Sequence, residues 1–379
     1  MKRLPAALLT AFAFPAAADL VVAAHDNKVY LDNGAVKVHA NPAPDFMTVL
    51  DFAVSPPKVV ARVEVPTSIV GPPFSIAMTR DESLALVSAA QKIDPADPTR
   101  TIADNRLSVI DLKASPPKVI ATLEAGAGAS GVSINRAGTL ALVANRNEGT
   151  VSVFTINGKT VTAAGKIKLG DEKSGPSHVA FTPDGKRAIV TRDGDHTLSM
   201  LAIDGNQVTD AKRDFGVGYR PYGVEVAPDG SFAVVANVGR SAGDNETVSL
   251  VDLRASPPRV VDTVSVGQTL EGITLSPDGK VAAIVTHNGS NKPKSSPFYN
   301  AAGLMVLLRV EGGKLTRFAD APIGVWSQGS AFSRDGKTIL VQNTVEREIQ
   351  VLRLEGDRLT DTGQRVKIDG GTAALRTAW

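Results

Sequence analysis

Residues 175–203 read GPSHVAFTPDGKRAIVTRDGDHTLSMLAI. This stretch predicts three strands, at 178–181, 187–191 and 197–203, joined by short polar turns. In Val179–Ala180–Phe181 the large apolar residues stand two apart, which is the period of a pleated strand. The first turn contains Asp184-Gly185, and glycine tolerates the positive φ that a tight hairpin needs. The stretch therefore predicts a small antiparallel sheet.

The same pattern recurs along the chain. Clear copies surround Asp229 (RPYGVEVAPDGSFAVVANVG), Asp278 (LEGITLSPDGKVAAIVTHNG) and Asp335 (SQGSAFSRDGKTILVQNT), and looser copies surround Asp81 and Ala137. Successive turns lie 45 to 57 residues apart. A period in this range, made only of strands and turns, is typical of a β-propeller with one four-stranded blade per repeat. The sequence therefore predicts an all-β propeller of about seven blades.

The two ends of the repeat region predict how the ring closes. Residues 20–25 resemble a second strand, and an excursion over 26–45 follows, with a small hairpin at Asp32-Asn33-Gly34. The innermost strand of this first blade is missing. The last residues, from Gly370 onward, resemble the opening of a repeat and then stop. We therefore expect the C-terminal strand to complete the N-terminal blade, in a single domain over 19–379.

Two further patterns predict the outer parts of the blades. VLDFAVSPPKVVARV (49–63) has near-copies at 109–123 and 250–264, and its Pro-Pro pair belongs in a rim turn because proline cannot donate to a strand ladder. The connections between the second and third strands are long in four blades, at 26–45, 91–105, 239–246 and 287–302. These connections are expected on one face, which makes that face the predicted binding surface.

Composition excludes several classes of protein. Lys and Arg number 41 against 39 Asp and Glu, and two of the cations, Lys2 and Arg3, fall in the first 18 residues. The remainder is neutral, which argues against nucleic acid as a partner. There is no cysteine, so disulfides, thiolate catalysis and covalent haem attachment are excluded.

The first 18 residues have the pattern of a signal peptide. Lys2-Arg3 precede an apolar core over 4–14, and Ala16-Ala17-Ala18 provides small residues before a cut at Asp19. This core is too short for a membrane anchor, and no membrane span is predicted elsewhere. We expect a periplasmic protein, or a secreted one, that is a monomer.

The ends of the second strands carry a family resemblance. Val143-Ala144-Asn145, Val235-Ala236-Asn237 and Val341-Gln342-Asn343 each follow the turn glycine by a few residues. This pattern resembles the YVTN-type repeat of the lactonase-like propeller superfamily, over nearly the whole chain. The resemblance implies a seven-bladed fold, and it is compatible with binding, electron-transfer-partner and hydrolytic roles.

One blade is also similar to the 6-phosphogluconolactonase-type propellers. Their characteristic stretch is G-P-R-H-x-x-F-x-P-x-G-K, and residues 175–186 match it except that Ser177 replaces the arginine. The family's following Asn-Glu reads Arg192-Asp193 here. The resemblance implies that His178 transfers protons and that the family's arginine holds a lactone or a phosphate.

His178 also stands out without the resemblance. The equivalent position is glycine in four other repeats, at 131, 223, 272 and 329. Histidine is the usual general acid or base near neutral pH, but it can equally be a structural group bonded to the backbone of a neighbouring blade. Glu225 faces the same way, and as a buried carboxylate it requires a cation, for which Arg220 and Arg376 are the candidates.

The remaining candidates are expected to bind a ligand at the mouth of the axial channel. Tyr222, Glu271 and Gln328 begin inner strands, while Arg192 and His287 take the asparagine position at the end of second strands. Trp326 precedes an inner strand and either stacks on a ligand or packs between blades. The five histidines show no metal-ligand spacing, and no cofactor motif occurs.

Two functions therefore remain open. The first is a binding or scaffold module that presents its loops to a periplasmic protein or a small molecule. The alternative is a lactonase-like hydrolase with His178 as general base and Glu225 in support. An accessory role for a periplasmic dehydrogenase has no motif behind it.

Overall fold

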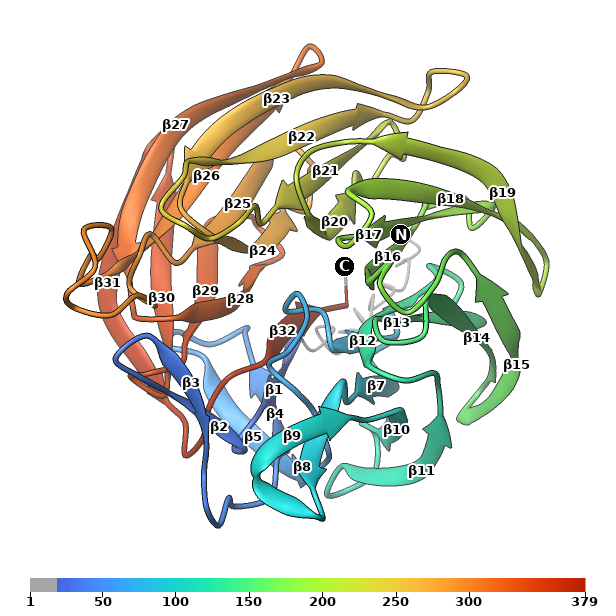
Figure 1. Cartoon of the computed structure of the whole chain (residues 1–379), viewed down its shortest axis with the longest axis horizontal. Helices are drawn as coiled ribbons and strands as arrows, with labels where there is room; N and C mark the ends of the chain where they lie inside the picture. The colour runs from blue at the N-terminus through green and yellow to red at the C-terminus, as the bar shows by residue number, and fades with distance from the viewer. Residues whose placement is uncertain (1–18, 379) are drawn as a thin grey trace, which may run out of the picture.

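The computed structural model describes residues 19–378, so the predicted signal peptide at 1–18 lies outside the described residues. Within residues 19–378 the chain forms strands, turns and loops, without a helix. Seven four-stranded antiparallel sheets surround an axis, as Figure 1 shows, which confirms the predicted seven-bladed propeller. Two further hairpins lie outside the blades, β2 (Val29–Asp32) with β3 (Ala35–Val38) and β8 (Gln91–Asp94) with β9 (Asp97–Ala103).

Each blade runs from an inner strand beside the axis to an outer strand at the rim. Blade one contains β32 (Ala374–Thr377), β1 (Leu20–His25), β4 (Phe46–Asp51) and β5 (Lys58–Glu64). Blade two contains β6 (Ile76–Met78), β7 (Leu84–Ser88), β10 (Arg106–Asp111) and β11 (Lys118–Glu124). Blade three contains β12 (Ala129–Ile134), β13 (Leu140–Asn145), β14 (Thr150–Asn157) and β15 (Thr160–Lys168).

The other four blades follow the same order. Blade four contains β16 (Pro176–Phe181), β17 (Arg187–Arg192), β18 (Thr197–Asp204) and β19 (Gln207–Gly216). Blade five contains β20 (Pro221–Val226), β21 (Phe232–Asn237), β22 (Glu246–Asp252) and β23 (Arg259–Gly267). Blade six contains β24 (Leu270–Leu275), β25 (Val281–Thr286), β26 (Gly303–Glu311) and β27 (Lys314–Ile323). Blade seven contains β28 (Ser327–Phe332), β29 (Thr338–Asn343), β30 (Glu348–Glu355) and β31 (Arg358–Lys367).

The C-terminal strand closes the ring as predicted. β32 pairs with β1 in antiparallel register, with Val21 opposite Thr377 and Ala24 opposite Ala374. The buried ring of His25 adds a contact between its Nδ1 and the carbonyl oxygen of Gly371 at 3.0 Å. Both ends of the propeller domain therefore stabilise one sheet.

The apolar core is a set of layers between neighbouring blades. Val21 and Val22 are consecutive on β1 and fully buried, yet Val21 packs toward Leu340 of blade seven and Val22 toward Ile76 of blade two. This follows from the two-residue period of a strand, which sends successive side chains to opposite faces of the sheet. Every blade thus depends on both of its neighbours.

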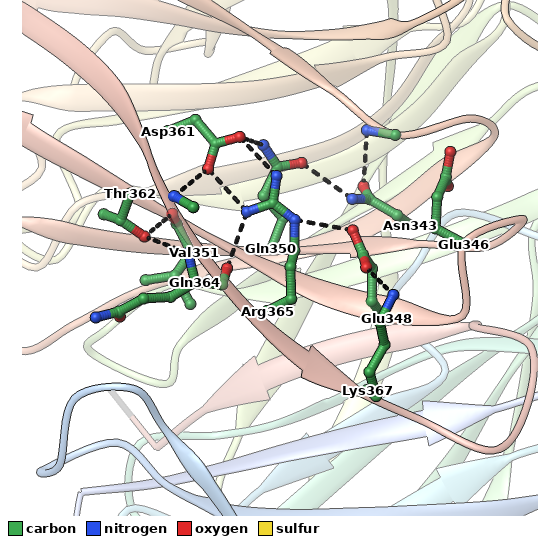
Figure 2. Close-up of polar contacts among 12 residues, drawn as sticks. Asn343, Glu346, Glu348, Gln350, Val351, Asp361, Thr362, Gln364, Arg365 and Lys367 are labelled. Carbon is green, nitrogen blue, oxygen red and sulfur yellow. Dashed lines mark hydrogen bonds and ion pairs between the residues drawn. The ribbon is translucent and has the colours of Figure 1, made fainter.

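The asparagine at the end of the second strand joins the inner and outer halves of a blade. In blade seven, Asn343 accepts a hydrogen bond from the Gly324 N–H (3.1 Å) and donates to Gln350 (3.0 Å). Figure 2 shows how Gln350 passes this contact on to Asp361 (3.0 Å), which also pairs with Arg365. Asn145 repeats the arrangement in blade three, with the Gly126 N–H (2.9 Å) as donor. The repeat's asparagine is therefore a structural residue.

A short segment before β6 closes the axial channel. The Phe74 ring stacks on His178 of blade four at a centroid distance of 3.8 Å, with the Arg376 guanidinium 4.2 Å from its centroid. A Cβ atom at Gly223 of blade five would lie 2.7 Å from the same ring, so glycine is required there. Phe74 is only 2% exposed although it reaches the axis. Phe74 therefore lies at the axis, between blade four and blade five.

Candidate active site at the channel mouth

We call the face that carries the connections between second and third strands the loop face, and the face that carries the Asp-Gly hairpins the turn face. At the loop-face end of the channel, the carboxylate of Asp193 binds two guanidiniums. It lies 3.0 Å from Arg146 of blade three and 3.1 Å from Arg220 of blade five. Asp193 is nearly buried, so this double ion pair holds both arginines beside the axis.

A buried carboxyl group faces these arginines. Glu271, at the start of the inner strand β24, is 8% exposed. Burial raises the pKa of Glu271 to about 8, although the positive charges of Arg146 and Arg220 act in the opposite direction. Tyr222 belongs to the same group of side chains, with the Arg146 guanidinium 5.4 Å from its ring centroid. Burial and the charge of Glu271 raise the pKa of the Tyr222 hydroxyl, which keeps it a neutral donor.

His287 completes the arrangement from blade six. Its Nε2 lies 3.6 Å from the Glu271 carboxylate and 3.1 Å from the carbonyl oxygen of Ser327, so this nitrogen carries the proton. Burial lowers the pKa of His287 to about 4, and the ring is therefore neutral at pH 7. Its Nδ1 is buried and has no partner among the described residues. We call the six residues Arg146, Asp193, Arg220, Tyr222, Glu271 and His287 the mouth cluster.

The other predicted ligand-binding residues lie elsewhere or are structural. Gln328 is 1% exposed beside blade six, and its buried Oε1 has no partner among the described residues. Arg192 points into blade four and pairs with Asp214 on the outer strand at 2.9 Å, so it substitutes for the repeat's asparagine. Trp326 is buried against Val29 and Ile69, which corresponds to packing and not to an exposed stacking surface.

His178, Glu225 and Arg376 lie together on the other side of Phe74. Arg376 forms an ion pair with Glu225, which is one of the two cations predicted for it. His178 is fully buried, and its Nδ1 accepts a hydrogen bond from the Val224 N–H of blade five at 3.3 Å. Burial, with a smaller contribution from Arg376, lowers the pKa of His178 well below 6.5. This contact is a bond to the backbone of a neighbouring blade, as the structural alternative for this histidine requires, and it leaves Nε2 without a partner among the described residues.

Two members of the mouth cluster were not predicted as site residues, Arg146 and Asp193. Arg146 follows Asn145 in a turn, where a charged residue is ordinarily exposed to solvent. In the structure its guanidinium contacts the Ser177 hydroxyl as well as Asp193. Ser177 is the position at which the lactonase-type pattern has arginine, so a guanidinium from the neighbouring blade lies beside that position. The signal that could have found Asp193 is its place in the family's Asn-Glu pair.

Long insertions form a wall beside the mouth cluster. The side-chain oxygen of Asn33, in the β2–β3 turn, accepts a hydrogen bond from the Lys294 N–H (3.0 Å). Phe298 packs on Gly243. These contacts join the insertions of blades one, five and six, and β3 contacts β9 of blade two. In Figure 1 the β2–β3 and β8–β9 hairpins lie over the blades, whereas blades three and four have short turns on this side. The insertions therefore cover the loop face unequally.

The described part of the chain, residues 19–378, contains no group of three or more His, Asp or Glu side chains that could hold a metal ion. Nor does any helix in that part of the chain have the length and apolar character to cross a membrane.

Comparison with known proteins agrees with the fold. Residues 103–219 match a family model described as "Lactonase, 7-bladed beta-propeller", a segment that includes Arg146, His178 and Asp193. No curated protein sequence matches the chain. A part of the chain thus matches a lactonase-type propeller, and the seven-bladed fold that the repeat resemblance implied is confirmed.

Several solved structures share this fold at low sequence identity. A Bacteroides fragilis protein provisionally named a 6-phosphogluconolactonase is 18% identical, with 95% of this chain and 98% of that chain covered and a TM-score of 0.72. The periplasmic gluconolactonase of Pseudomonas aeruginosa is 16% identical over 95% and 98% of the two chains, with a TM-score of 0.68. Hydrazine synthase of Kuenenia stuttgartiensis is 22% identical over 82% and 90%, with a TM-score of 0.62. At such identities the likeness shows the fold alone.

Proposed function

We propose that the protein hydrolyses a lactone at the mouth cluster. The observation that carries the proposal is Glu271, a buried carboxyl group with a pKa near 8 that faces two guanidiniums held by Asp193. A carboxyl group that titrates near the working pH is suited to general base and acid catalysis. Strongly perturbed groups of this kind concentrate at functional sites.

The groups of the cluster suit the steps of lactone hydrolysis. The ionised Glu271 takes a proton from a water molecule as its oxygen attacks the lactone carbonyl carbon. Arg146 and Arg220 donate hydrogen bonds to the negative oxygen that develops there, an interaction that is strongest in the transition state. The carbon–oxygen bond of the ring then breaks, and the proton passes from Glu271 to the departing ring oxygen. The product is a hydroxy acid.

Glu271 fits the role of base better than His178. The neutral His178 ring accepts a hydrogen bond at Nδ1, so its proton resides on Nε2 and neither nitrogen is available to take another. The ring also lies against Phe74, away from the guanidiniums of the mouth cluster. We therefore assign proton transfer to Glu271.

The comparisons support the choice of substrate and compartment. Two structural neighbours are named for gluconolactones, so D-glucono-δ-lactone and its 6-phosphate are the first substrates to assay. One of these neighbours is periplasmic, in line with the signal-peptide pattern of residues 1–18. We propose that the protein acts in the periplasm, and an N-terminus at Asp19 in periplasmic extract would support that location.

The test compares lactone hydrolysis, above the rate without enzyme, for the wild type and Glu271→Gln. We expect Glu271→Gln to lower kcat by about 10² to 10⁴-fold, since it keeps the shape and removes the base. Glu355→Gln is the matched control, because its side chain is 71% exposed at the rim of blade seven. Should the wild type accelerate no lactone, the hydrolase proposal fails and the binding-module hypothesis takes its place.

A further inference from the structure

The turn face holds a cavity that the proposed reaction does not use. Its volume is about 340 Å³, which lies in the range of small-molecule sites. His178, Glu225 and Arg376 line it, and Phe74 separates it from the mouth cluster. A ligand here would therefore enter from the turn face.

One donor in this cavity is fully buried and unpaired. His178 is 1% exposed, and its Nε2 has no hydrogen-bond partner among the described residues. Because Nδ1 accepts the Val224 N–H, the neutral ring carries its proton on Nε2. A buried N–H without an acceptor is costly, and a ligand oxygen would remove this cost.

The charges around the cavity favour an anion. Arg80 and Arg136 stand at its exposed rim, and Arg376 lies inside it in an ion pair with Glu225. With His178 neutral, three positive charges face one negative charge. The walls include apolar side chains, among them Met78, Val132 and Leu275. An inorganic ion would make no apolar contact with these side chains, whereas an organic anion would.

We propose that the turn-face cavity is a second binding site, for a small organic carboxylate with an apolar body. The carboxylate accepts from His178 Nε2–H and from the rim guanidiniums, and the body packs on the apolar walls. The Phe74 ring keeps this ligand apart from the proposed lactone site. The site is independent of whether the mouth cluster hydrolyses a lactone.

Calorimetric titration of the whole protein with benzoate, and separately with inorganic phosphate, at low ionic strength tests the proposal. We expect benzoate to bind and to bind at least tenfold more tightly than phosphate. Equal affinities for benzoate and phosphate would overturn the proposal, since they would mean that the site recognises only negative charge and not an apolar body. The absence of detectable binding heat for benzoate would overturn it as well.

Two sets of variants locate the site. The double substitution Arg80→Ala with Arg136→Ala should weaken benzoate about tenfold through lost attraction, and Glu225→Gln should tighten it several-fold by removing the opposing charge. Arg240→Ala, an exposed arginine on the loop face, is the matched control and should leave the affinity unchanged. Benzoate binding that is insensitive to both sets would place the ligand outside the turn-face cavity and contradict the proposal. Because the rim arginines are exposed, their loss is not expected to affect folding.

Discussion

Ring closure gives a stability prediction that follows directly from the packing. Leu375 of β32 is 1% exposed and lies between blades one and seven, in contact with a cluster that includes Val21, Leu340 and Ile349. Leucine-to-alanine changes in a core cost about 2–5 kcal/mol, and the larger values occur where the surroundings cannot collapse. Both walls of this layer are paired strands. Leu375→Ala should therefore lower the free energy of unfolding by about 3–5 kcal/mol.

Urea denaturation followed by far-UV circular dichroism measures this loss. Val60→Ala is the control, because Val60 is 57% exposed on the outer strand of blade one and its substitution should cost less than about 0.5 kcal/mol. A loss below about 1 kcal/mol for Leu375→Ala would refute the reasoning, since it would mean that the C-terminal strand is not seated in blade one. Removal of residues 371–379 should be more damaging still and should prevent cooperative unfolding.

Three further predictions concern the buried polar groups. Burial lowers the pKa values of His25 and His287 to about 4, so the unfolded chain binds more protons than the folded chain between pH 4 and 6.5. Stability should therefore fall as the pH drops from 6.5 to 4, by up to roughly 3 kcal/mol for each histidine. A urea midpoint that stays flat across this range would contradict the prediction. Glu271 has the opposite sign. Its pKa rises from 4.5 to about 8, so its contribution to stability should be lost as the pH rises from 4.5 to 8, with up to roughly 2 kcal/mol of that loss between pH 6.5 and 8, and a Glu271→Gln variant should lack that fall. Asn343→Ala should lower the free energy of unfolding by about 1–3 kcal/mol, because it leaves the Gly324 N–H and Gln350 without their partner. Asn300→Ala, on the exposed insertion of blade six, is the control and should lower it little. Equal urea midpoints for the two variants would count against the structural role of the repeat's asparagine.

The fold could be predicted because the sequence of each blade contains the local patterns of its own strands and turns. The Asp-Gly turn and the apolar alternation recur in every clear repeat, and the terminal asparagine recurs in two of them (Asn237 and Asn343), so the blade number and the ring closure followed from counting. The glycine column also had a readable cause. A Cβ atom at Gly131 would lie 2.6 Å from the His178 ring, and one at Gly329 would lie 2.6 Å from the backbone nitrogen of Leu375.

The site could be predicted only in part, because it depends on how blades meet. Tyr222, Glu271 and His287 were candidates from their strand positions and Arg220 as a cation for Glu225, and the structure brings these four together. Arg146 reaches them from a turn in another blade, which no local pattern reveals. The segment before β6 carries Phe74 into the axis, which no local pattern reveals either. Residues on the loop-face side of the Phe74 ring belong to the mouth cluster, and residues on its turn-face side line the other cavity.

The most direct measurement is the pH dependence of lactone hydrolysis by the wild type and by Glu271→Gln, after subtraction of the reaction without enzyme. With Glu271 as the base, kcat/KM should rise with pH and level off above an apparent pKa near 8, and the residual activity of Glu271→Gln should lack that inflection. An unchanged profile in the glutamine variant would contradict the assignment of Glu271 and of the mouth cluster as the site of hydrolysis.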